Sequence, residues 1–277
     1  MEAAVDQLST LGHPQRLAVF RLLVRRYPGA VPAGEIADAL RLKPSTLSMY
    51  LASLRGAGLI AQGRRGTSLL YRADMDGAGA LLAFLFDDCC RGRPDLCLPL
   101  AAVPSGAPPM TQAKPAVLFI CTGNSARSIF AEAILRQEAG DRFTAHSAGT
   151  KPRSELNPVA VDLLRAKGHD ISCLRAKHVS EFQGEGAPKL DFVFTVCDRA
   201  ANEDCPAWPG QPITGHWGTP DPVKAQGTEA ERALAFQRAY AELRNRILPF
   251  VALRVRGMSR AAIQSEVDDI GRAVEPR

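Results

Sequence analysis

The sequence predicts a chain of two domains: an N-terminal winged helix-turn-helix domain, followed by an α/β domain whose mainly parallel sheet is covered by helices on both faces. The first observation is the length, because 277 residues can build two hydrophobic cores. The second is a series of helical periodicities that ends in a hairpin pattern before Met75. The third is an alternation of apolar strands and helices that begins at Pro115, which is typical of a parallel sheet between helices.

The composition is ordinary for a protein of the cytoplasm. No apolar run approaches the roughly 20 residues that a membrane-spanning helix needs, and Met1–Asp6 lacks the basic and apolar regions of a secretory signal. We therefore expect a cytoplasmic protein without a membrane partner. Its seven cysteines are expected to be reduced thiols, ligands or redox groups and not structural disulfides. The net charge of +5 decides little by itself.

Three helices and a hairpin are predicted in the first domain. The helices are expected at 13–26, 33–40 and 45–55, and the hairpin strands at 59–62 and 67–72, around a tip at 63–66. The side chains expected to face the core are Leu17, Phe20 and Val24 in the first helix and Leu47, Leu51 and Leu54 in the third. This order of elements is that of a winged helix-turn-helix.

The charge distribution in this domain favours nucleic acid as the partner. Residues 41–73 contain no Asp or Glu, although they contain six Lys or Arg. This is the electrostatic footprint of a protein that binds double-stranded operator DNA. The candidate DNA-binding residues are Lys43, Ser45, Thr46, Ser48, Met49, Tyr50, Arg64 and Arg65. A helical protein-interaction module with a solvated basic edge is the alternative.

The first domain resembles the ArsR-type family of winged-helix metalloid-responsive repressors. The resemblance covers about residues 7–97 and is carried by 11–17, 44–48 and 54–60. Tyr50 is a departure, because relatives often carry His there, and this leaves the operator sequence open. Such repressors form homodimers through terminal helices, and the helix predicted at 75–90 is a candidate.

Three cysteines follow that candidate helix: Cys89, Cys90 and Cys97. Adjacent cysteines rarely pair with each other, but with a third thiol they can converge on a soft ion. No fourth Cys or nearby His completes a tetrahedral zinc site. Three thiolates suit trivalent arsenic, and some arsenic-responsive repressors carry a similar set. Arsenite is therefore the expected regulatory ligand, and ordinary buried cysteines are the alternative.

The domain boundaries follow from composition. We expect the DNA-binding and metalloid-sensing domain at 1–97, a linker rich in Pro and small residues at 98–114, the catalytic domain at 115–255 and a helical tail without assigned function at 256–277. In the second domain, strands are predicted at 117–120, 143–147 and 190–196, and helices at 128–137, 157–167 and 229–248. The final helix offers Leu234, Phe236, Tyr240, Leu243 and Ile247 for burial.

A loop between the first strand and the first helix of this domain carries the chemistry. It reads Cys-x5-Arg-Ser, from Cys121 to Ser128, and a loop of this length can turn its backbone N–H groups around a tetrahedral anion. Arg127 offers a planar fork of donors, and the helix end, Arg127 and Ser128 are expected to favour a Cys121 thiolate. A buried structural Cys is the alternative. The predicted anion-binding residues are Thr122, Gly123 for the tight turn, Asn124 in a left-handed conformation, Ser125, Ala126, Arg127 and Ser128.

From about Pro115 to Leu253 the chain resembles the low-molecular-weight protein tyrosine phosphatases and the arsenate reductases that share their fold. The resemblance rests on the Cys121 loop and on Asp221-Pro222, where that superfamily keeps its general acid. Ala126 is a departure, because several relatives carry a second Cys there. The resemblance implies that Asp221 is the proton donor.

Three further features favour a reductase. Cys197 follows a strand whose end points toward the same crevice as Cys121, and Cys205 lies eight positions on. A phosphatase needs neither thiol, whereas a reductase needs one to attack the Cys121 adduct and one to resolve the disulfide. Val223-Lys224 follows Asp221-Pro222, where tyrosine phosphatases carry aromatic residues. These segments resemble thiol-cycling arsenate reductases, in which the spacing of the two later cysteines is often one residue shorter.

The predicted function is an arsenite-responsive repressor fused to an arsenate reductase. The predicted catalytic residues are Cys121, Arg127, Asp221, Cys197 and Cys205, with arsenate as substrate and thioredoxin or a small thiol as reductant. No tightly bound cofactor is expected. A tyrosine phosphatase localised on DNA and a DNA-bound redox sensor without turnover are the alternatives. The remaining candidates are expected to be structural, namely Cys173, His146, His169 and His178, and His216 either supports Asp221 or packs beside Trp217.

Overall fold

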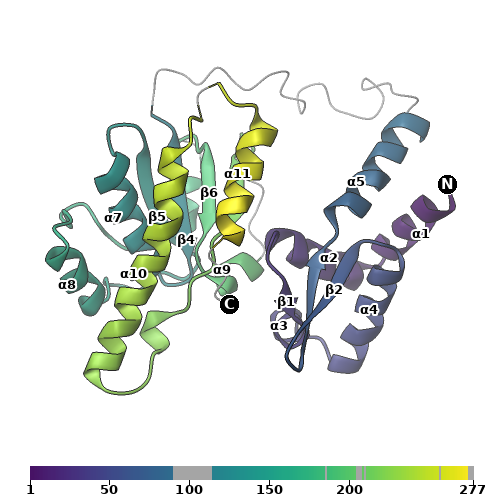
Figure 1. Ribbon diagram of the computed structural model, residues 1–277, viewed down its shortest axis with the longest axis horizontal. Coiled ribbons are helices and arrows are strands. Elements are labelled where there is room, and N and C mark those ends of the chain that lie inside the picture. Colours follow the sequence, from purple (N-terminus) through teal and green to yellow (C-terminus); the bar gives the residue numbers. More distant parts are fainter. Residues whose placement is uncertain (90–113, 185, 204–207, 209, 256, 274–277) are drawn as a thin grey trace. The chain divides into compact units, whose positions relative to one another are not determined.

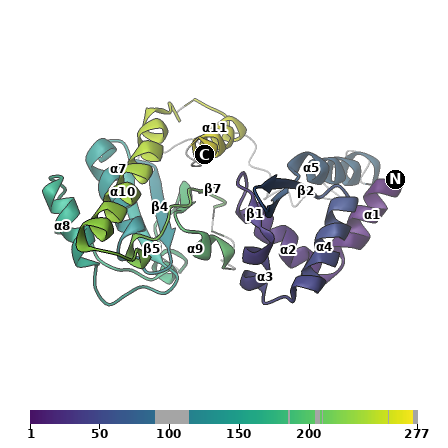
Figure 2. The ribbon, with the colours of Figure 1, turned by 60° about the horizontal axis from the view of Figure 1, so that its bottom comes forward.

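The computed structural model describes residues 1–89, 114–184, 186–203, 208, 210–255 and 257–273. The chain divides into two compact units, Met1–Pro108 and Pro109–Arg277, which are drawn in Figure 1 and Figure 2. The predicted linker lies outside the described residues except for Lys114. In the described parts of both units, no helix is long and apolar enough to cross a membrane.

The first unit is a winged helix-turn-helix, as predicted. Its sheet is antiparallel with the strand order β1-β3-β2. Its elements are α1 (Glu2–Leu11), α2 (Pro14–Arg25), β1 (Val31–Pro32), α3 (Ala33–Leu40), α4 (Pro44–Gly56), β2 (Ile60–Arg65), β3 (Ser68–Ala73), α5 (Met75–Phe84) and a π-helical turn, η1 (Leu85–Cys89). Helix α1 and the short strand β1 were not predicted from the sequence.

The core face of α2 differs from the prediction. Val19, Leu22 and Leu23 are fully buried, whereas Leu17 and Val24 are exposed. Of the predicted core residues of α2, only Phe20 packs against the core, and it is partly buried. Both sets fit a helical period because α2 carries apolar residues on two sides, and periodicity alone could not choose between them. In α4 the predicted core face is correct. Its three leucines are buried, and they are Leu47, Leu51 and Leu54.

The hairpin is longer than predicted. Strand β2 continues to Arg65, which pairs with Ser68, so the turn consists of Gly66 and Thr67 and not of residues 63–66. Gly66 has a φ of 59°, a conformation that glycine adopts easily in a two-residue turn. The longer strand places the exposed Arg64 and Arg65 at the end of the wing.

The second unit contains a four-stranded sheet flanked by helices. The strand order is β5-β4-β6-β7, and every pairing is parallel. The elements are β4 (Ala116–Cys121), α7 (Arg127–Ala139), β5 (Thr144–Gly149), α8 (Pro158–Ala166), η2 (Val179–Phe182), β6 (Phe192–Thr195), α9 (Asp198–Asn202), β7 (Ile213–His216), η3 (Pro222–Lys224), α10 (Glu229–Ala252) and α11 (Arg260–Arg272). Strand β7 and the short helices α9, η2 and η3 were not predicted.

An aromatic cluster fixes the centre of this unit. The rings of Phe194 and Trp217 stack with centroids 3.9 Å apart, and Phe250 of α10 packs edge-on against both. Every residue of β4 is buried, as expected for a central strand of a parallel sheet. In α10, Leu234 is 42% exposed, which contradicts the predicted burial. The other four predicted core residues of α10 are buried, namely Phe236, Tyr240, Leu243 and Ile247.

Helix α11 covers the edge strand β7. Its apolar residues Ile263, Val267 and Ile270 are buried, and α11 lies beside α10 in Figure 1. A Cβ at Gly215 would lie only 2.9 Å from Val267 Cγ1, so a glycine is needed where helix and strand meet. Gln264 Nε2 donates to the Thr214 carbonyl at 2.8 Å, which satisfies an edge acceptor. The predicted helical tail is therefore part of the core.

Candidate active site

The loop from Cys121 to Arg127 lies at the carboxyl end of β4, where parallel sheets bind ligands. Residues 150–157 hold its carbonyl groups from outside. Four backbone bonds do so: Thr150 N to Cys121 O at 3.1 Å, and Lys151 N to Thr122 O, Arg153 N to Gly123 O and Asn157 N to Ser125 O, each at 2.9 Å. With these carbonyls turned outward, the N–H groups of the loop are available to surround an anion.

Asn124 ties the loop together. It is fully buried and has a φ of 43°, the left-handed conformation predicted for it. Its Nδ2 donates to Ser128 Oγ at 2.8 Å and to Ser147 Oγ at 2.9 Å, and its Oδ1 accepts from Lys177 N at 2.7 Å. These bonds connect the loop to α7, β5 and the segment before η2, so the loop shape is fixed before an anion binds.

The glycine that this loop needs is not Gly123. Gly123 has no positive φ, and a Cβ there would make only ordinary contacts of 3.6 Å. A Cβ at Gly149 would instead lie 2.7 Å from Thr122 O and 3.0 Å from Asn124 Cβ. The end of β5 therefore has to be glycine so that the loop can pack against it, and the role predicted for Gly123 was wrong.

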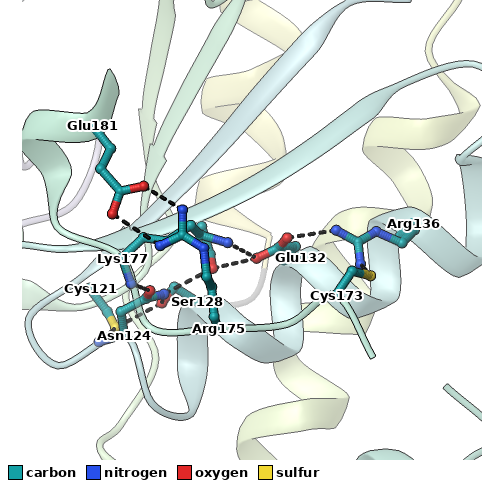
Figure 3. Close-up of polar contacts among 10 residues, drawn as sticks. Cys121, Asn124, Ser128, Glu132, Arg136, Cys173, Arg175, Lys177 and Glu181 are labelled. Carbon is teal, nitrogen blue, oxygen red and sulfur yellow. Dashed lines mark hydrogen bonds and ion pairs between the residues drawn. The ribbon is translucent and has the colours of Figure 1, made fainter. Parts of the chain in front are cut away.

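A buried carboxylate, which was not predicted from the sequence, supports the loop from below. Glu132 is 2% exposed, and it accepts from Ser147 Oγ, from Lys177 Nζ at 3.0 Å and from Arg136 Nη2 at 2.7 Å (Figure 3). A buried charge is tolerated when it is paired and hydrogen-bonded. The sequence signal that could have revealed Glu132 is an acidic residue in an otherwise apolar face of α7. Figure 3 shows the chain of contacts that leads from Glu132 to Cys121.

Cys121 lies buried at the floor of the loop. Its Sγ is 3.0 Å from Ser128 Oγ and accepts from the backbone N of Asn124 at 3.2 Å. Burial raises the pKa of the Cys121 thiol, and the nearby Cys197 raises it further, whereas Ser128 and Arg127 lower it. Of the three contributions predicted to favour the thiolate, Arg127 and Ser128 lower the pKa as expected, but the net pKa of Cys121 is raised because burial outweighs them.

Arg127 and Asp221 meet at the mouth of the loop. Arg127 Nη2 lies 2.9 Å from Asp221 Oδ2, and Arg127 Nη1 donates to the Thr219 carbonyl at 3.0 Å. Asp221 also begins η3, because its Oδ1 accepts from Val223 N at 3.2 Å. The Asp221 carboxylate and the Thr219 carbonyl thus each occupy one Nη of the guanidinium that was predicted to bind an oxyanion, so an anion there competes with Asp221.

Cys197 lies beside the same loop. It is 1% exposed, its Sγ accepts from Ala200 N at 3.4 Å at the start of α9, and Thr122 Oγ1 is 3.5 Å from that sulfur. The structure thus brings two of the three predicted relay thiols to one end of the sheet, and both are free cysteines. The third, Cys205, lies outside the described residues.

Two minor predictions need correction. Cys173 does not pack in the core but is exposed and contacts Arg136. His216 makes polar contacts that were not predicted, because its Nε2 lies 3.0 Å from Asp198 Oδ1 and its Nδ1 2.8 Å from Thr195 Oγ1. The other histidines make structural contacts. His169 bonds to Tyr240, His146 contacts the Phe182 ring and His178 caps η2.

In the first unit, the predicted DNA-binding residues gather on α4 and the wing. Most are exposed, but Tyr50 is half-buried, with its ring 5.1 Å from that of His13. The exposed ones are Lys43, Ser45, Ser48, Met49, Arg64 and Arg65, while Thr46 is half-buried. Ser48 Oγ donates to Pro44 O at 2.9 Å. Of the predicted arsenite ligands, Cys89 is exposed at the end of η1, and Cys90 and Cys97 lie outside the described residues.

Comparisons with known proteins give separate matches for the two units. The sequence pattern of the low molecular weight phosphotyrosine protein phosphatases matches residues 116–255, and that of a helix-turn-helix domain matches residues 11–62. The arsenate reductase of Bacillus subtilis (strain 168) is 40% identical over 134 residues, which cover 48% of this chain and 93% of that protein. Arsenate reductase 2 of Staphylococcus haemolyticus (strain JCSC1435) is 33% identical over 138 residues, or 50% of this chain and 96% of that protein. A solved arsenate reductase from Archaeoglobus fulgidus DSM 4304 is 25% identical, with coverage of 50% of this chain and 99% of that chain and a TM-score of 0.40.

Proposed function

Through residues 116–255 the chain belongs to the low molecular weight phosphotyrosine protein phosphatase family, and we propose that this member reduces arsenate to arsenite by a thiol relay. The observation that carries the proposal is the pair of buried thiols, Cys121 and Cys197, at one end of the sheet. Hydrolysis of a phosphate ester needs no thiol besides Cys121. Reduction of arsenic requires two electrons, and a second thiol supplies them as a disulfide forms.

The first step uses the loop as an anion site. Arsenate, an isostere of phosphate, binds to the inward N–H groups and takes the Arg127 fork from Asp221. The Cys121 thiolate attacks arsenic, a sulfur–arsenic bond forms and an arsenic–oxygen bond breaks. The displaced Asp221 carboxylate takes up the proton that the Cys121 thiol loses and passes it to the leaving oxygen, which departs as water.

The second step transfers the electrons. The Cys197 thiolate attacks the Cys121 sulfur, so a sulfur–sulfur bond forms and the sulfur–arsenic bond breaks. Its electron pair stays on arsenic, which leaves as arsenite, while the two thiols have become a disulfide. Cys205 then attacks Cys197 and frees Cys121, and thioredoxin or a small thiol reduces the resulting disulfide. The electrons come from thiols, and no bound cofactor takes part.

A direct comparison of two activities tests the reductase against a phosphatase. Purified protein is given arsenate, thioredoxin, thioredoxin reductase and NADPH, and in parallel an aryl phosphate. We expect arsenate-dependent NADPH consumption, with phosphate release as a side activity of the same loop. Phosphate release without any arsenate-dependent oxidation, with thioredoxin or with small thiols, would favour a phosphatase localised on DNA.

For the first unit, we propose a homodimeric repressor of the ArsR type. The exposed residues of α4 and the basic wing provide the chemistry for DNA, since phosphates attract Arg64 and Arg65 and small polar side chains can approach base edges. Apolar side chains on the terminal helices support a dimer. Leu82 on α5 is 67% exposed, and Val5 and Leu8 on α1 are also exposed.

We further propose that the reductase product, arsenite, releases the repressor by binding Cys89, Cys90 and Cys97. Moving a two-state equilibrium from mostly bound to mostly free takes a differential affinity of about 5.5 kcal/mol, which three sulfur–arsenic bonds could provide. Operator binding is measured by fluorescence anisotropy at fixed salt. Arsenite should release the wild type, and the Cys89→Ser/Cys90→Ser protein should bind DNA equally well and not respond. Equal release of both proteins would place the sensor elsewhere.

Because Asp221 forms an ion pair with Arg127, its replacement should have opposite effects on phosphate binding and on catalytic turnover. Asp221→Ala removes a carboxylate that competes with anions for the guanidinium, so inorganic phosphate should bind more tightly, by about fivefold if the pair contributes about 1 kcal/mol. The same variant lacks the proton donor, and aryl phosphate turnover should fall about 10²- to 10⁴-fold. Calorimetric titration with phosphate and steady-state kinetics measure the two effects. Weaker phosphate binding by the variant would contradict this role of the pair.

A further inference from the structure

His216 and Asp198 form a contact for which the proposed reaction has given no role. His216 is the last residue of β7, with a side chain that is 8% exposed, and its Nε2 lies 3.0 Å from Asp198 Oδ1. Its other ring nitrogen lies 2.8 Å from Thr195 Oγ1, so the ring is held from both sides. Asp198 directly follows Cys197 and is the first residue of α9.

The backbone around this contact is shaped to fit it. A Cβ at Gly218 would lie 2.7 Å from both Asp198 Oδ1 and His216 Nε2, so a larger residue there would displace these two side chains. Trp217 N donates to Thr195 O at 2.8 Å, which continues the pairing of β6 and β7 toward Cys197. The segment that leads to Asp221 therefore runs along the residues on the amino-terminal side of Cys197.

These contacts anchor the chain on both sides of the relay thiol. On its amino-terminal side, Thr195 and Val196 are held by backbone bonds from Trp217 and Thr219. On its carboxyl-terminal side, the Asp198 side chain is held by His216. We propose that His216 and Asp198 are positioning residues that hold Cys197 in place for its attack on the Cys121 adduct. This inference rests on the proposed reductase function and deepens it.

The physical reason is the geometry that a disulfide demands. Attack on sulfur requires the Cys197 sulfur to approach Cys121 closely and in line with the bond that breaks. Cys197 is also the residue from which the chain turns into α9. Without an anchor at Asp198, the start of α9 can shift, and the Cys197 sulfur shifts with it. A misplacement of about 1 Å can reduce a rate by about 10²-fold.

Asp198 offers a clean test because its side chain is 54% exposed. Replacing a carboxylate that is more than half exposed to solvent has little effect on stability, so Asp198→Ala should fold normally. Asp198→Asn keeps an oxygen that can accept from His216 Nε2 and serves as the conservative rescue. Asp162→Ala is the matched control, because Asp162 on α8 is also an exposed acid in an ion pair, with Arg165.

Two rates are measured on the full chain. Arsenite release after one equivalent of arsenate, without added reductant, reports the attack by Cys197. Aryl phosphate hydrolysis reports Cys121, Arg127 and Asp221 alone. We expect Asp198→Ala to release arsenite about 10- to 100-fold more slowly and to hydrolyse the aryl phosphate within about twofold of the wild type. Asp198→Asn should recover most of the lost rate, and Asp162→Ala should match the wild type in both assays.

Each contrary outcome identifies what fails. Arsenite release by Asp198→Ala at the wild-type rate would overturn the positioning role while leaving the reductase intact. A parallel loss of both activities would show a general structural role and would overturn it as well. A wild-type protein that hydrolyses the aryl phosphate but releases no arsenite would refute the reductase function itself, and with it any role of the pair in that step.

Discussion

Cys121→Ser protein is expected to reduce no arsenate and to hydrolyse no aryl phosphate. Both reactions start with attack by the Cys121 sulfur on the bound anion, and a serine hydroxyl in the same buried position is far less acidic and less nucleophilic than a thiol. The loop itself should remain intact, because Asn124 and the 150–157 segment hold it without the sulfur. We expect turnover to fall by at least about 10⁴-fold in both assays.

The matched control is Cys173→Ser, which removes an exposed thiol that contacts Arg136. This variant should keep both activities. Phosphate should still bind to Cys121→Ser, because the N–H groups and Arg127 remain, and calorimetric titration can check this. Substantial turnover by Cys121→Ser, measured on protein free of wild-type contamination, would refute the mechanism.

Cys197→Ser separates the two chemistries of the loop. The variant should lose multiple-turnover arsenate reduction with thioredoxin, because no thiol is left to attack the Cys121 adduct. It should keep aryl phosphatase activity, which ends at Cys121 and Asp221. Normal cycling of arsenate by Cys197→Ser would show that the relay is wrong and that an external thiol attacks the adduct directly.

The same variant should change the pH dependence of the phosphatase activity. Cys197 raises the pKa of Cys121, so its removal should lower that pKa and increase the thiolate fraction at a given pH. The ascending limb of kcat/KM against pH should therefore move to lower pH. The profile of Cys173→Ser should not move, and a shift to higher pH in Cys197→Ser would contradict the coupling between the two thiols.

The site was predictable where its chemistry is local in the sequence. Strand, loop, Arg127 and helix follow one another between Ala116 and Ala139, so spacing alone indicated an anion loop. The buried face of α4 was also predictable, because its three leucines recur at helical spacing and define one apolar face. In α2, the spacing of the apolar residues allowed two different buried faces. Only packing against neighbouring elements determines which face is buried.

The supports of the site were not predictable, because they depend on residues far apart in the chain. Glu132 becomes a support only when Ser147 and Lys177 reach it from other segments. The need for Gly149 arises from a contact with Thr122 that no local pattern records. Strand β7 is four residues long and ends in Gly215 and His216. Its run of apolar residues is therefore too short to identify a strand from the sequence.

The central claim is that the two buried thiols pass electrons to arsenic. It is tested most directly by a single turnover with stoichiometric arsenate and fully reduced protein, in which arsenite and remaining thiols are both counted. The account predicts one arsenite for every pair of thiols lost, with the first disulfide linking Cys121 and Cys197 when Cys205 is replaced by serine. Arsenite formed without loss of protein thiols, or thiols lost without arsenite, would contradict it.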